Sequence, residues 1–381
     1  MSSRSVLLVT LGFLVATSAA ASPAGAAEDT ARIAAVGDMV CDGPPSEGAG
    51  PRSEDRRYLR GFCQYGKVSD LVVDGRYDRF LPLGDLQYYF GALRAFRRWY
   101  DATFGRAMKI TAPVPGNHEA YSVDADGNPF AGYRAYFGDR AHWNRRGGSY
   151  SFDIGGWHVV VANSEWCRRY TYAFEDGRWS RIPMWSEGSP WGCHAGDPLR
   201  DWLERDLERH AATECTLLAF HHPAYFWAGS PDGPDGVRHG AWYSLARPLY
   251  RVFYRSGGDV LLTGHQHFYE RFMPIDARAR LDPEYGFTQF IVGTGGDTLQ
   301  RLPRPSLMPP QVAAASDNAF GILEMELRSG GFDWRFVAAE GSPGSWRRSE
   351  EHGFRIFENG DATGPVDEGS GVCHDAPPTD D

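Results

Sequence analysis

A surplus of positive charge is the first feature that this sequence lacks. Its 381 residues carry 39 Lys and Arg against 49 Asp and Glu, a formal net charge of −10 at pH 7. Nucleic-acid affinity depends on neutralising phosphates with Lys and Arg, so this balance argues against nucleic acid as a partner. Any attraction for an anionic substrate would have to come from bound metal ions, because the net charge of the protein opposes it.

Long apolar runs are also scarce. The run from Val6 to Val15 follows Arg4 and precedes the small residues of Ala19 to Ala27. It is too short to cross a bilayer comfortably, and these flanks are typical of a secretory signal peptide. We therefore expect cleavage of residues 1–27, with an uncleaved membrane anchor as the alternative. The mature protein, from Glu28, is expected to be secreted or periplasmic and to have no membrane contact after cleavage.

Cysteine is rare, with six in the chain, and no Cys-x-x-Cys spacing occurs. A thiolate metal site is therefore disfavoured. An even number of cysteines in an exported chain instead predicts disulfides. Nearness in sequence favours Cys41–Cys63 and Cys167–Cys193, which leaves Cys215 to pair with Cys373.

Glycine and proline are abundant, at 45 and 25 residues, which favours strands joined by shaped loops over a helical bundle. Helical spacing of apolar residues predicts one helix through Leu93 and Phe104 and another through Leu199 and Leu207. Two glycine pairs predict hairpins. The strands expected alone are Arg32–Val36, Arg79–Leu83, Lys109–Val114, Thr216–Phe220, Val260–Thr263 and Thr288–Val292; those expected in hairpins are Tyr150–Ile154 with Trp157–Val161 and Ile322–Leu327 with Phe332–Val337.

Strands that alternate with helices and then give way to hairpins predict an α/β fold of the mixed, α+β kind. The chain shows no internal repeat and no interdomain linker. We expect one catalytic domain over residues 28–345 and a C-terminal extension over 346–381. The stretch from about Asn359 is acidic and rich in Gly, Pro and Ser, so a loose tail is expected there.

Five short polar clusters, each directly after an apolar run, stand out against this background. They are Gly37-Asp38, Gly84-Asp85-Leu86-Gln87-Tyr88, Gly116-Asn117-His118-Glu119, His221-His222-Pro223 and Gly264-His265-Gln266-His267. Ligands of α/β sheets bind outside the carboxyl ends of the strands, where such loops converge. We therefore expect the five clusters to form one site.

In this order, the clusters resemble the motifs of the calcineurin-like metallophosphoesterase superfamily, and within it the purple acid phosphatases. The resemblance runs from Ala31 to Gly296. Most of the superfamily has a metal-ligating His two residues after the first Asp, where this chain has Val40. Like the purple acid phosphatases, it has Tyr88 three residues after Asp85. The resemblance implies a two-sheet β-sandwich flanked by helices, the metallophosphoesterase architecture.

The resemblance also implies a binuclear metal centre bridged by Asp85. A phenolate is a hard oxygen ligand that suits a ferric ion, so Fe(III) is expected at the Tyr88 site, beside a second divalent metal, Fe, Zn or Mn. The alternation of His265 and His267 would let both rings reach the metals from one side of an extended segment. The implied ligands are Asp38, Tyr88 and His267 for the first metal, and Asn117, His221 and His265 for the second.

Several further residues have expected roles beside the metals. His118 resembles the catalytic histidine of the superfamily that contacts the phosphate and protonates the leaving oxygen; positioning Asp38 or Asn117 is the alternative. His239 is a second catalytic candidate or a plain loop residue, since an insertion from Gly229 to Gly236 separates it from the motif. Supporting or structural roles are expected for His222, Glu119 and the pair Glu270-Arg271.

The expected activity is that of an exported binuclear phosphatase, in which a metal-bound hydroxide attacks phosphomonoesters in line. One alternative is a phosphodiesterase or nucleotidase with Mn or Zn at the second site. Another is an extracellular binding protein without turnover. Small-molecule phosphate esters are the expected partners, and the oligomeric state stays open. The aromatic segment Trp166–Trp191 either overhangs the pocket or is a stapled structural loop; its candidate substrate-facing residues are Tyr170, Tyr172, Phe174, Trp179 and Trp185.

Overall fold

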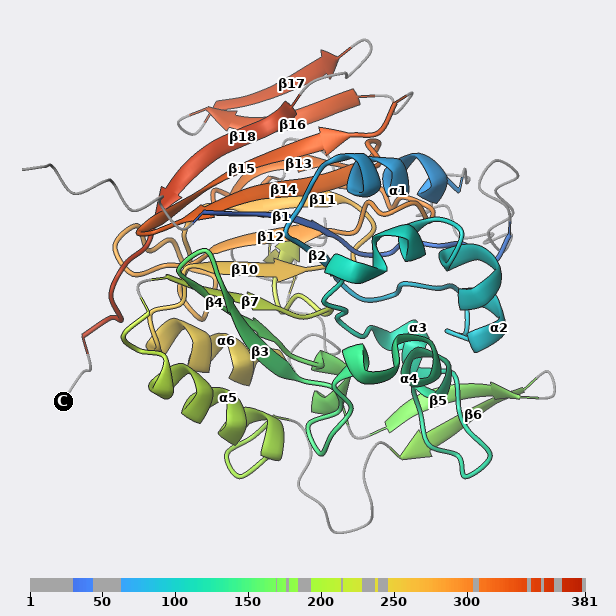
Figure 1. The fold of residues 1–381 in the computed structure, drawn as a ribbon. Helices are drawn as coiled ribbons and strands as arrows, with labels where there is room; N and C mark the ends of the chain where they lie inside the picture. The colour runs from blue at the N-terminus through green and yellow to red at the C-terminus, as the bar shows by residue number, and fades with distance from the viewer. Residues whose placement is uncertain are drawn as a thin grey trace, which may run out of the picture.

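Two large mixed β-sheets pack against each other with helices on their outer sides (Figure 1). The expected mixed α/β, two-sheet architecture is therefore confirmed. The computed structural model describes residues 30–43, 63–168, 170–175, 178–183, 193–213, 215–227, 237–238, 246–303, 308–340, 344–350, 353–359 and 365–378. The signal peptide expected over residues 1–27 lies outside this part of the chain.

The first sheet has five strands, in which β1 pairs in parallel with β2 and antiparallel with β14. In spatial order the strands are β18 (Pro365–Val372), β15 (Gly331–Ala338), β14 (Gly321–Arg328), β1 (Ala31–Val36) and β2 (Arg79–Pro82).

The second sheet has nine strands and a parallel centre, β4-β7-β10-β12. In spatial order they are β17 (Gly353–Asn359), β16 (Gly344–Glu350), β13 (Val312–Ser316), β11 (Tyr269–Phe272), β12 (Thr288–Val292), β10 (Val260–Thr263), β7 (Cys215–Ala219), β4 (Trp157–Val161) and β3 (Tyr150–Ile154). Two small ribbons pair β5 (Tyr170–Glu175) with β6 (Arg178–Pro183) and β8 (Phe226–Trp227) with β9 (Val237–Arg238).

The central strands are mostly apolar because both of their faces are buried. Along β7, Leu217 and Ala219 face the core between the sheets, whereas Leu218 faces the core under the helices. Successive side chains of a strand point to opposite faces, so one apolar run serves two cores. The same alternation places Val159 and Val160 of β4 in different cores.

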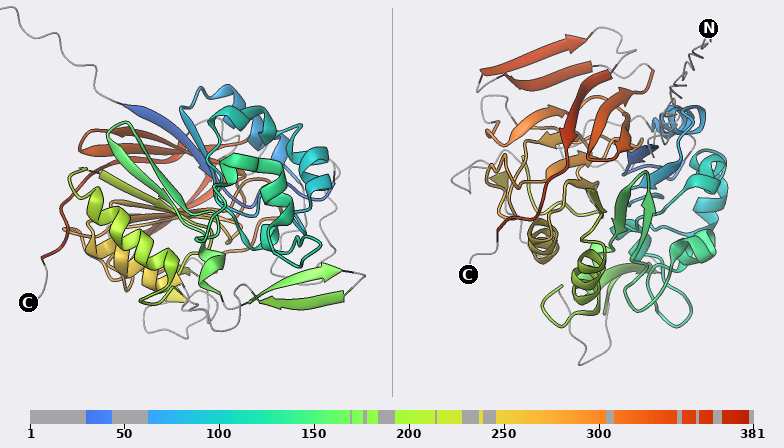
Figure 2. Two further views of the ribbon diagram at one scale, coloured as in Figure 1. Left: turned by 60° about the horizontal axis from the view of Figure 1, so that its bottom comes forward. Right: turned by 60° about the vertical axis from the view of Figure 1, so that its left-hand side comes forward.

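Helices α5 (Pro198–Arg209) and α6 (Arg247–Arg255) pack together against the outer face of the nine-stranded sheet (Figure 2). Asp197 caps α5 by accepting a hydrogen bond from the Leu199 backbone N–H at 2.9 Å, and Pro198 occupies the first turn. The other helical elements are α1 (Tyr65–Asp74), α2 (Leu93–Ala95), η1 (Phe96–Tyr100), η2 (Phe104–Ile110), α3 (Asn117–Ala120), α4 (Ala131–Phe137), η3 (Gly138–Ala141) and η4 (Ser164–Cys167). Within the described part of the chain, no helix combines the length and apolar character that a membrane crossing requires.

The prediction of a strand over Lys109–Val114 is wrong. The 3-10 helix η2 continues to Ile110, and beyond it Thr111 and Val114 make isolated bridges to Phe80 and Leu83. The N–H groups of Ala112 and Val114 donate to the carbonyls of Phe80 and Pro82, at 2.8 and 3.0 Å, but Pro82 has no N–H to make the intervening bond, so a continuous ladder cannot form. The other predicted strands and both predicted hairpins are present, with bounds shifted by a residue at some ends.

The C-terminal segment is also better ordered than expected. Strand β18, in the stretch predicted to be loose, pairs along its length with β15. Asp367 of β18 accepts hydrogen bonds from Arg271, at 2.7 and 3.0 Å, and from the Tyr269 hydroxyl at 2.7 Å. The expectation of a loose tail is therefore wrong for Pro365–Val372. All three expected disulfides are present: Cys41–Cys63, Cys167–Cys193 and Cys215–Cys373.

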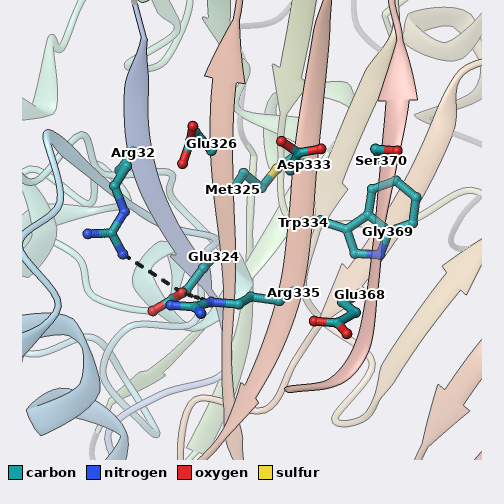
Figure 3. Close-up of a pocket in the computed structure, with 10 residues that line it drawn as sticks. All are labelled: Arg32, Glu324, Met325, Glu326, Asp333, Trp334, Arg335, Glu368, Gly369 and Ser370. Carbon is teal, nitrogen blue, oxygen red and sulfur yellow. Dashed lines mark hydrogen bonds and ion pairs between the residues drawn. The ribbon is translucent and has the colours of Figure 1, made fainter. Parts of the chain in front are cut away.

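The outer face of the five-stranded sheet carries a shallow pocket lined by charged side chains of β1, β14, β15 and β18 (Figure 3). Glu324 lies at its centre and pairs with both Arg32 and Arg335. None of the residues predicted for the functional site lines this pocket. The face is therefore a solvated, ion-paired surface of the sandwich.

Candidate metal centre

The site lies where the carboxyl ends of the two sheets meet. Asp38 and Asp85 follow β1 and β2 of the first sheet, while His221 and His265 follow β7 and β10 of the second. Backbone hydrogen bonds connect these loops, from the Asp38 N–H to the Gly84 carbonyl at 3.0 Å and from the Gly264 N–H to the His221 carbonyl at 3.1 Å. The convergence expected at strand ends is thus observed.

The glycine before Asp85 is required by this close approach. Gly84 has φ +85°, and a Cβ there would lie 2.4 Å from Nδ1 of His221. L side chains rarely adopt that φ, and the contact would displace the imidazole. The recurrence of Gly directly before the site residues therefore has a steric reason as well as a conformational one.

One half of the site surrounds the Tyr88 hydroxyl. Tyr88 Oη lies 3.0 Å from Asp38 Oδ1, 3.3 Å from Asp85 Oδ2 and 2.9 Å from His267 Nε2. Burial and the carboxylates of Asp38, Asp85 and Asp297 raise the pKa of this phenol well above its usual value. A bound cation reverses that preference, because it favours the phenolate.

The other half of the site joins His221, His265 and Asn117. His221 Nε2 lies 3.1 Å from Asp85 Oδ2 and 3.1 Å from His265 Nδ1. The side-chain amide of Asn117 donates to the Tyr121 hydroxyl at 3.0 Å, while its buried Oδ1 has no hydrogen-bond partner among the described residues. Asn117 directly precedes His118, whose backbone N–H donates to Asp85 Oδ1 at 2.8 Å. A buried amide oxygen without a partner, on a segment that contacts Asp85, is available as a metal ligand.

Backbone carbonyls set the tautomers of two of these histidines. Nδ1 of His221 faces the Leu83 carbonyl at 2.8 Å, and Nδ1 of His267 faces the Thr298 carbonyl at 2.6 Å. A carbonyl can only accept, so both Nδ1 atoms carry the proton and direct Nε2 into the site. This is the usual second contact of a metal-ligating histidine.

The charges of the three imidazoles differ because their neighbours differ. Burial lowers the pKa of His221, but the carboxylates of Asp85 and Asp38 outweigh burial and raise it to about 10. The carboxylates of Asp38 and Asp297 likewise outweigh burial at His267 and raise its pKa to about 9. Burial and the adjacent His222 and His221 hold the pKa of His265 well below its usual value.

Six of the seven residues predicted as ligands lie in mutual contact: Asp38, Asp85, Tyr88, His221, His265 and His267. Asn117 is on α3, beside His118, and contributes the orphaned Oδ1. These carboxylate, phenol, amide and imidazole donors fit a metal pair in their chemistry. Asp85 Oδ2 lies between the two halves, within 3.3 Å of Tyr88 Oη and 3.1 Å of His221 Nε2. A shared carboxylate at that position is what a bridging ligand requires.

His118, predicted to be catalytic, lies at the edge of this cluster. Its backbone N–H donates to Asp85 Oδ1 at 2.8 Å, and Nδ1 donates to the Tyr89 carbonyl at 2.6 Å. Nε2 is 3.8 Å from Asp85 Oδ2. The ring is partly exposed, with 19% of its side-chain surface accessible. Its Nε2 is therefore within reach of a ligand bound at the centre.

Glu119, Glu270 and Arg271 have the supporting positions expected of them. The Glu119 carboxylate accepts from the backbone N–H groups of Asp85, Leu86, Gln87 and Gly116, at 2.8 to 3.2 Å. It thereby shapes the loop that presents Asp85 and Tyr88. Glu270 accepts from the Trp227 N–H, and Arg271 pairs with Asp367, away from the metal cluster.

His222 belongs to a network that sequence reasoning missed. Its Nδ1 lies 2.8 Å from Ser164 Oγ and its Nε2 lies 3.1 Å from Glu165 Oε1. The same Glu165 oxygen accepts from Arg168 at 2.6 Å. Burial, His221 and Arg168 lower the pKa of His222, although Glu165 opposes them. A signal was available, because Ser164 and Glu165 follow the apolar strand β4 as the other clusters follow theirs.

Two further predictions concern residues expected at the edge of the site, namely His239 and the aromatic segment Trp166–Trp191. His239 and the insertion Gly229–Gly236 lie outside the described residues, as do the side chains of Phe174, Trp179 and Trp185. Tyr170 and Tyr172 are on the β5–β6 hairpin, which lies in the sequence between the two cysteines of the Cys167–Cys193 disulfide and contacts α3. The guanidinium of Arg181 lies over the Tyr170 ring, 3.9 Å from its centroid. The hairpin thus adjoins the helix that carries Asn117 and His118.

Comparison with known proteins bears on this site. The model of the calcineurin-like phosphoesterase family matches residues 31–269, which include all five motifs. The human acid phosphatase type 7 is 29% identical over 64% of this chain and 48% of its own length. Purple acid phosphatase 21 of Arabidopsis thaliana is 26% identical over 61% of this chain and 46% of its own. The chain thus spans about half the length of these curated relatives.

Solved structures share the fold. The purple acid phosphatase PPD1 from yellow lupin seeds superposes with a TM-score of 0.53 and 17% identity, covering 82% of this chain and 52% of its own. The structure of PhoD gives a TM-score of 0.52 and 13% identity over 90% of this chain and 74% of its own. At these identities the likeness establishes the architecture.

Proposed function

The chain belongs to the calcineurin-like phosphoesterase family, and from this premise we propose that it is a binuclear metal-dependent phosphatase that hydrolyses phosphomonoesters. The observation that carries the proposal is the position of Asp85 Oδ2, which is 3.3 Å from Tyr88 Oη and 3.1 Å from His221 Nε2. One carboxylate shared by two donor sets supports two adjacent cations. The acid phosphatases among its relatives support the choice of reaction.

The proposed ligands divide into two sets that share Asp85. Asp38, Tyr88 and His267 would hold the first ion, and Asn117, His221 and His265 the second. We assign Fe(III) to the Tyr88 set, because a phenolate favours a hard trivalent cation, and a divalent Fe, Zn or Mn to the other. Two such ions supply an activated water and neutralise the charge of the phosphoryl oxygens.

The protein's own contribution is positioning and proton transfer. His118 donates Nδ1–H to the Tyr89 carbonyl, which holds the ring with Nε2 toward the site. A protonated Nε2 can hydrogen-bond a phosphoryl oxygen and transfer its proton to the leaving alkoxide. Glu119 keeps the Asp85 loop in shape through its backbone hydrogen bonds. The three disulfides support an oxidising, extracytoplasmic location.

The test is a visible absorption spectrum and metal analysis of the same purified sample, followed by hydrolysis assays. We expect a broad mid-visible band and about one iron per chain, both lost in Tyr88→Phe. We expect mono-aryl phosphates to be hydrolysed faster than bis-aryl phosphates. A colourless protein that contains Mn or Zn and prefers the diester would overturn both the ferric and the monoesterase assignments.

The bridging role of Asp85 is tested by kinetics. Asp85→Asn keeps the size of the side chain but removes the charge that two cations would share. We expect kcat/KM for a mono-aryl phosphate to fall by at least about 10³-fold, since each metal contributes several kcal/mol to the transition state. Activity within tenfold of the wild type would exclude Asp85 as the bridge.

A further inference from the structure

The His222 ring is fixed at both of its nitrogens. Ser164 Oγ lies 2.8 Å from Nδ1 and also accepts from the His222 backbone N–H at 3.1 Å. Glu165 Oε1, 3.1 Å from Nε2, can only accept, so Nε2 carries the ring proton and Nδ1 of the neutral ring accepts from the Ser164 hydroxyl. Both nitrogens of His222 are thus hydrogen-bonded in this arrangement, although one of them also lies within 4.8 Å of ligand atoms of His221 and His265.

This fixed ring packs against two of the proposed ligands. Its centroid is 4.4 Å from that of His265 and 4.8 Å from that of His221. The His222 ring therefore lies directly beside the His221–His265 pair, in which His265 Nδ1 is 3.1 Å from His221 Nε2. Any rotation of His222 would remove the packing that keeps His265 in its present orientation.

The position of the His222 ring depends on Glu165. Its carboxylate is completely buried and serves both Arg168, at 2.6 Å, and His222. Arg168 is itself largely buried, with 12% of its side-chain surface exposed. Both contacts use Oε1, while Oε2 is buried without a hydrogen-bond partner among the described residues. The two partners of Oε1 connect η4 to the loop that follows β7, and loss of either would leave a buried charge less compensated.

We propose that Glu165 is a positioning residue that acts through His222 on His265 and His221, and thereby sets the affinity of the second metal site. The inference rests on the proposed metal pair. Groups that hydrogen-bond metal-binding residues typically change metal affinity by 10- to 100-fold when they are replaced. Glu165 differs from such groups in acting one residue further away, through ring packing.

The test is calorimetric titration of metal-free protein with Zn²⁺. We expect two binding events in the wild type. Glu165→Gln, which keeps size and polarity, and His222→Phe, which keeps the ring without its hydrogen bonds, should each weaken one event by about 10- to 100-fold and leave the other unchanged. Ser164→Ala should weaken the same event by less. In an Asn117→Ala background, Glu165→Gln should have no further effect on the event that remains.

The matched control is Asp206→Asn. Asp206 also joins a buried histidine, His158, to an arginine three residues later, Arg209, but on helix α5 away from the metal cluster. Both Zn²⁺ affinities should stay within about twofold of the wild type. Thermal unfolding of each variant separates local effects from loss of fold.

Three results would overturn the inference. Wild-type affinities at both sites in Glu165→Gln and His222→Phe would show that the network only stabilises the fold. Loss of one event in His222→Phe without any change in Glu165→Gln would make His222 a ligand itself. Fewer than two events in the wild type would overturn the proposed metal pair as well, which distinguishes that failure from the first two.

Discussion

Two regions of the molecule contain the same triad, a carboxylate that joins a histidine to an arginine. The two triads differ in the residues that surround them. At the metal cluster, Glu165 joins His222 to Arg168; on helix α5, Asp206 joins His158 to Arg209. In each, the arginine follows the carboxylate by three residues and the histidine comes from a loop or strand of the nine-stranded sheet. Burial raises the pKa of both carboxylates, but their partners outweigh it and lower the pKa to about 2.

The pKa values of the two histidines nevertheless shift in opposite directions. His158 lies between two carboxylates, 2.7 Å from Asp153 and 3.2 Å from Asp206, which outweigh burial and raise its pKa. His222 faces one carboxylate, and burial with the nearby His221 and Arg168 lowers its pKa. The triad alone therefore does not determine in which direction the pKa of its histidine shifts. A second carboxylate raises the pKa of His158, whereas burial, with the nearby His221 and Arg168, lowers that of His222.

The largest difference between the two triads should appear when the arginine is removed. Arg168→Met leaves Glu165 buried without its cation, so we expect the free energy of unfolding to fall by about 3–5 kcal/mol. Arg209 is 59% exposed, and Arg209→Met should cost about 0–1 kcal/mol. Denaturant unfolding of both variants measures this. Equal losses would show that burial does not distinguish the two pairs.

A smaller difference is expected between replacing the Cys167–Cys193 disulfide and replacing the Cys215–Cys373 disulfide. Cys167–Cys193 lies within the segment that holds Glu165 and Arg168, whereas Cys215–Cys373 ties down the C-terminal strand. Replacing either pair by serine should lower the free energy of unfolding by about 2–4 kcal/mol. Loss of Zn²⁺ affinity should accompany the first replacement alone. Unchanged Zn²⁺ binding in Cys167→Ser/Cys193→Ser would show that this disulfide does not support the metal site.

The smallest effect depends on pH and belongs to the α5 triad. The folded pKa of His158 is raised, so its stabilisation is complete below the unfolded pKa of about 6.5 and is lost as pH rises through the folded value. His158→Gln should lower the free energy of unfolding by about 1–3 kcal/mol at pH 6, the value of a hydrogen bond to a charged group.

The cost of that replacement should shrink as the pH is raised toward 9. The charged and titratable groups that face or pack against this imidazole are Asp153, Asp206, Arg209 and His210. Asp206→Asn in the same pH series serves as the control, because it removes one of the two carboxylates. A loss in His158→Gln that is constant from pH 6 to pH 9 would contradict a raised pKa.

Sequence patterns predicted most of the fold because a run of apolar residues can be recognised from neighbouring positions in the chain alone. Uninterrupted runs such as Thr216–Phe220 mark strands buried on both faces, and the polar residue after each run marks the site. Nearness in sequence was sufficient to pair Cys41 with Cys63 and Cys167 with Cys193, which left Cys215 for Cys373. The strand predicted over Lys109–Val114 is absent because Pro82 of the neighbouring β2 lacks the N–H that a continuous ladder needs.

What the sequence could not show depends on neighbours that are distant along the chain. Glu165 meets His222 because β4 and β7 are adjacent and parallel, and no local pattern indicates that pairing. Strand β18 is polar and is held by backbone pairing, so its composition indicated a loose tail. The pKa shifts of His158 and His222 likewise depend on tertiary contacts.

The Cys215–Cys373 bond has a mechanical consequence for the whole sandwich. Cys215 begins β7 of one sheet, while Cys373 directly follows β18 of the other, so the bond clasps the two sheets at the end opposite the site. At the site end, Asp38 and Asp85 belong to one sheet and His221 and His265 to the other. Backbone hydrogen bonds already join the sheets there, such as that from the Gly37 N–H to the Val292 carbonyl at 2.8 Å. Ions bound at this end would strengthen that connection, so chelation should make the metal-binding edge more open to protease while the disulfide holds the opposite end.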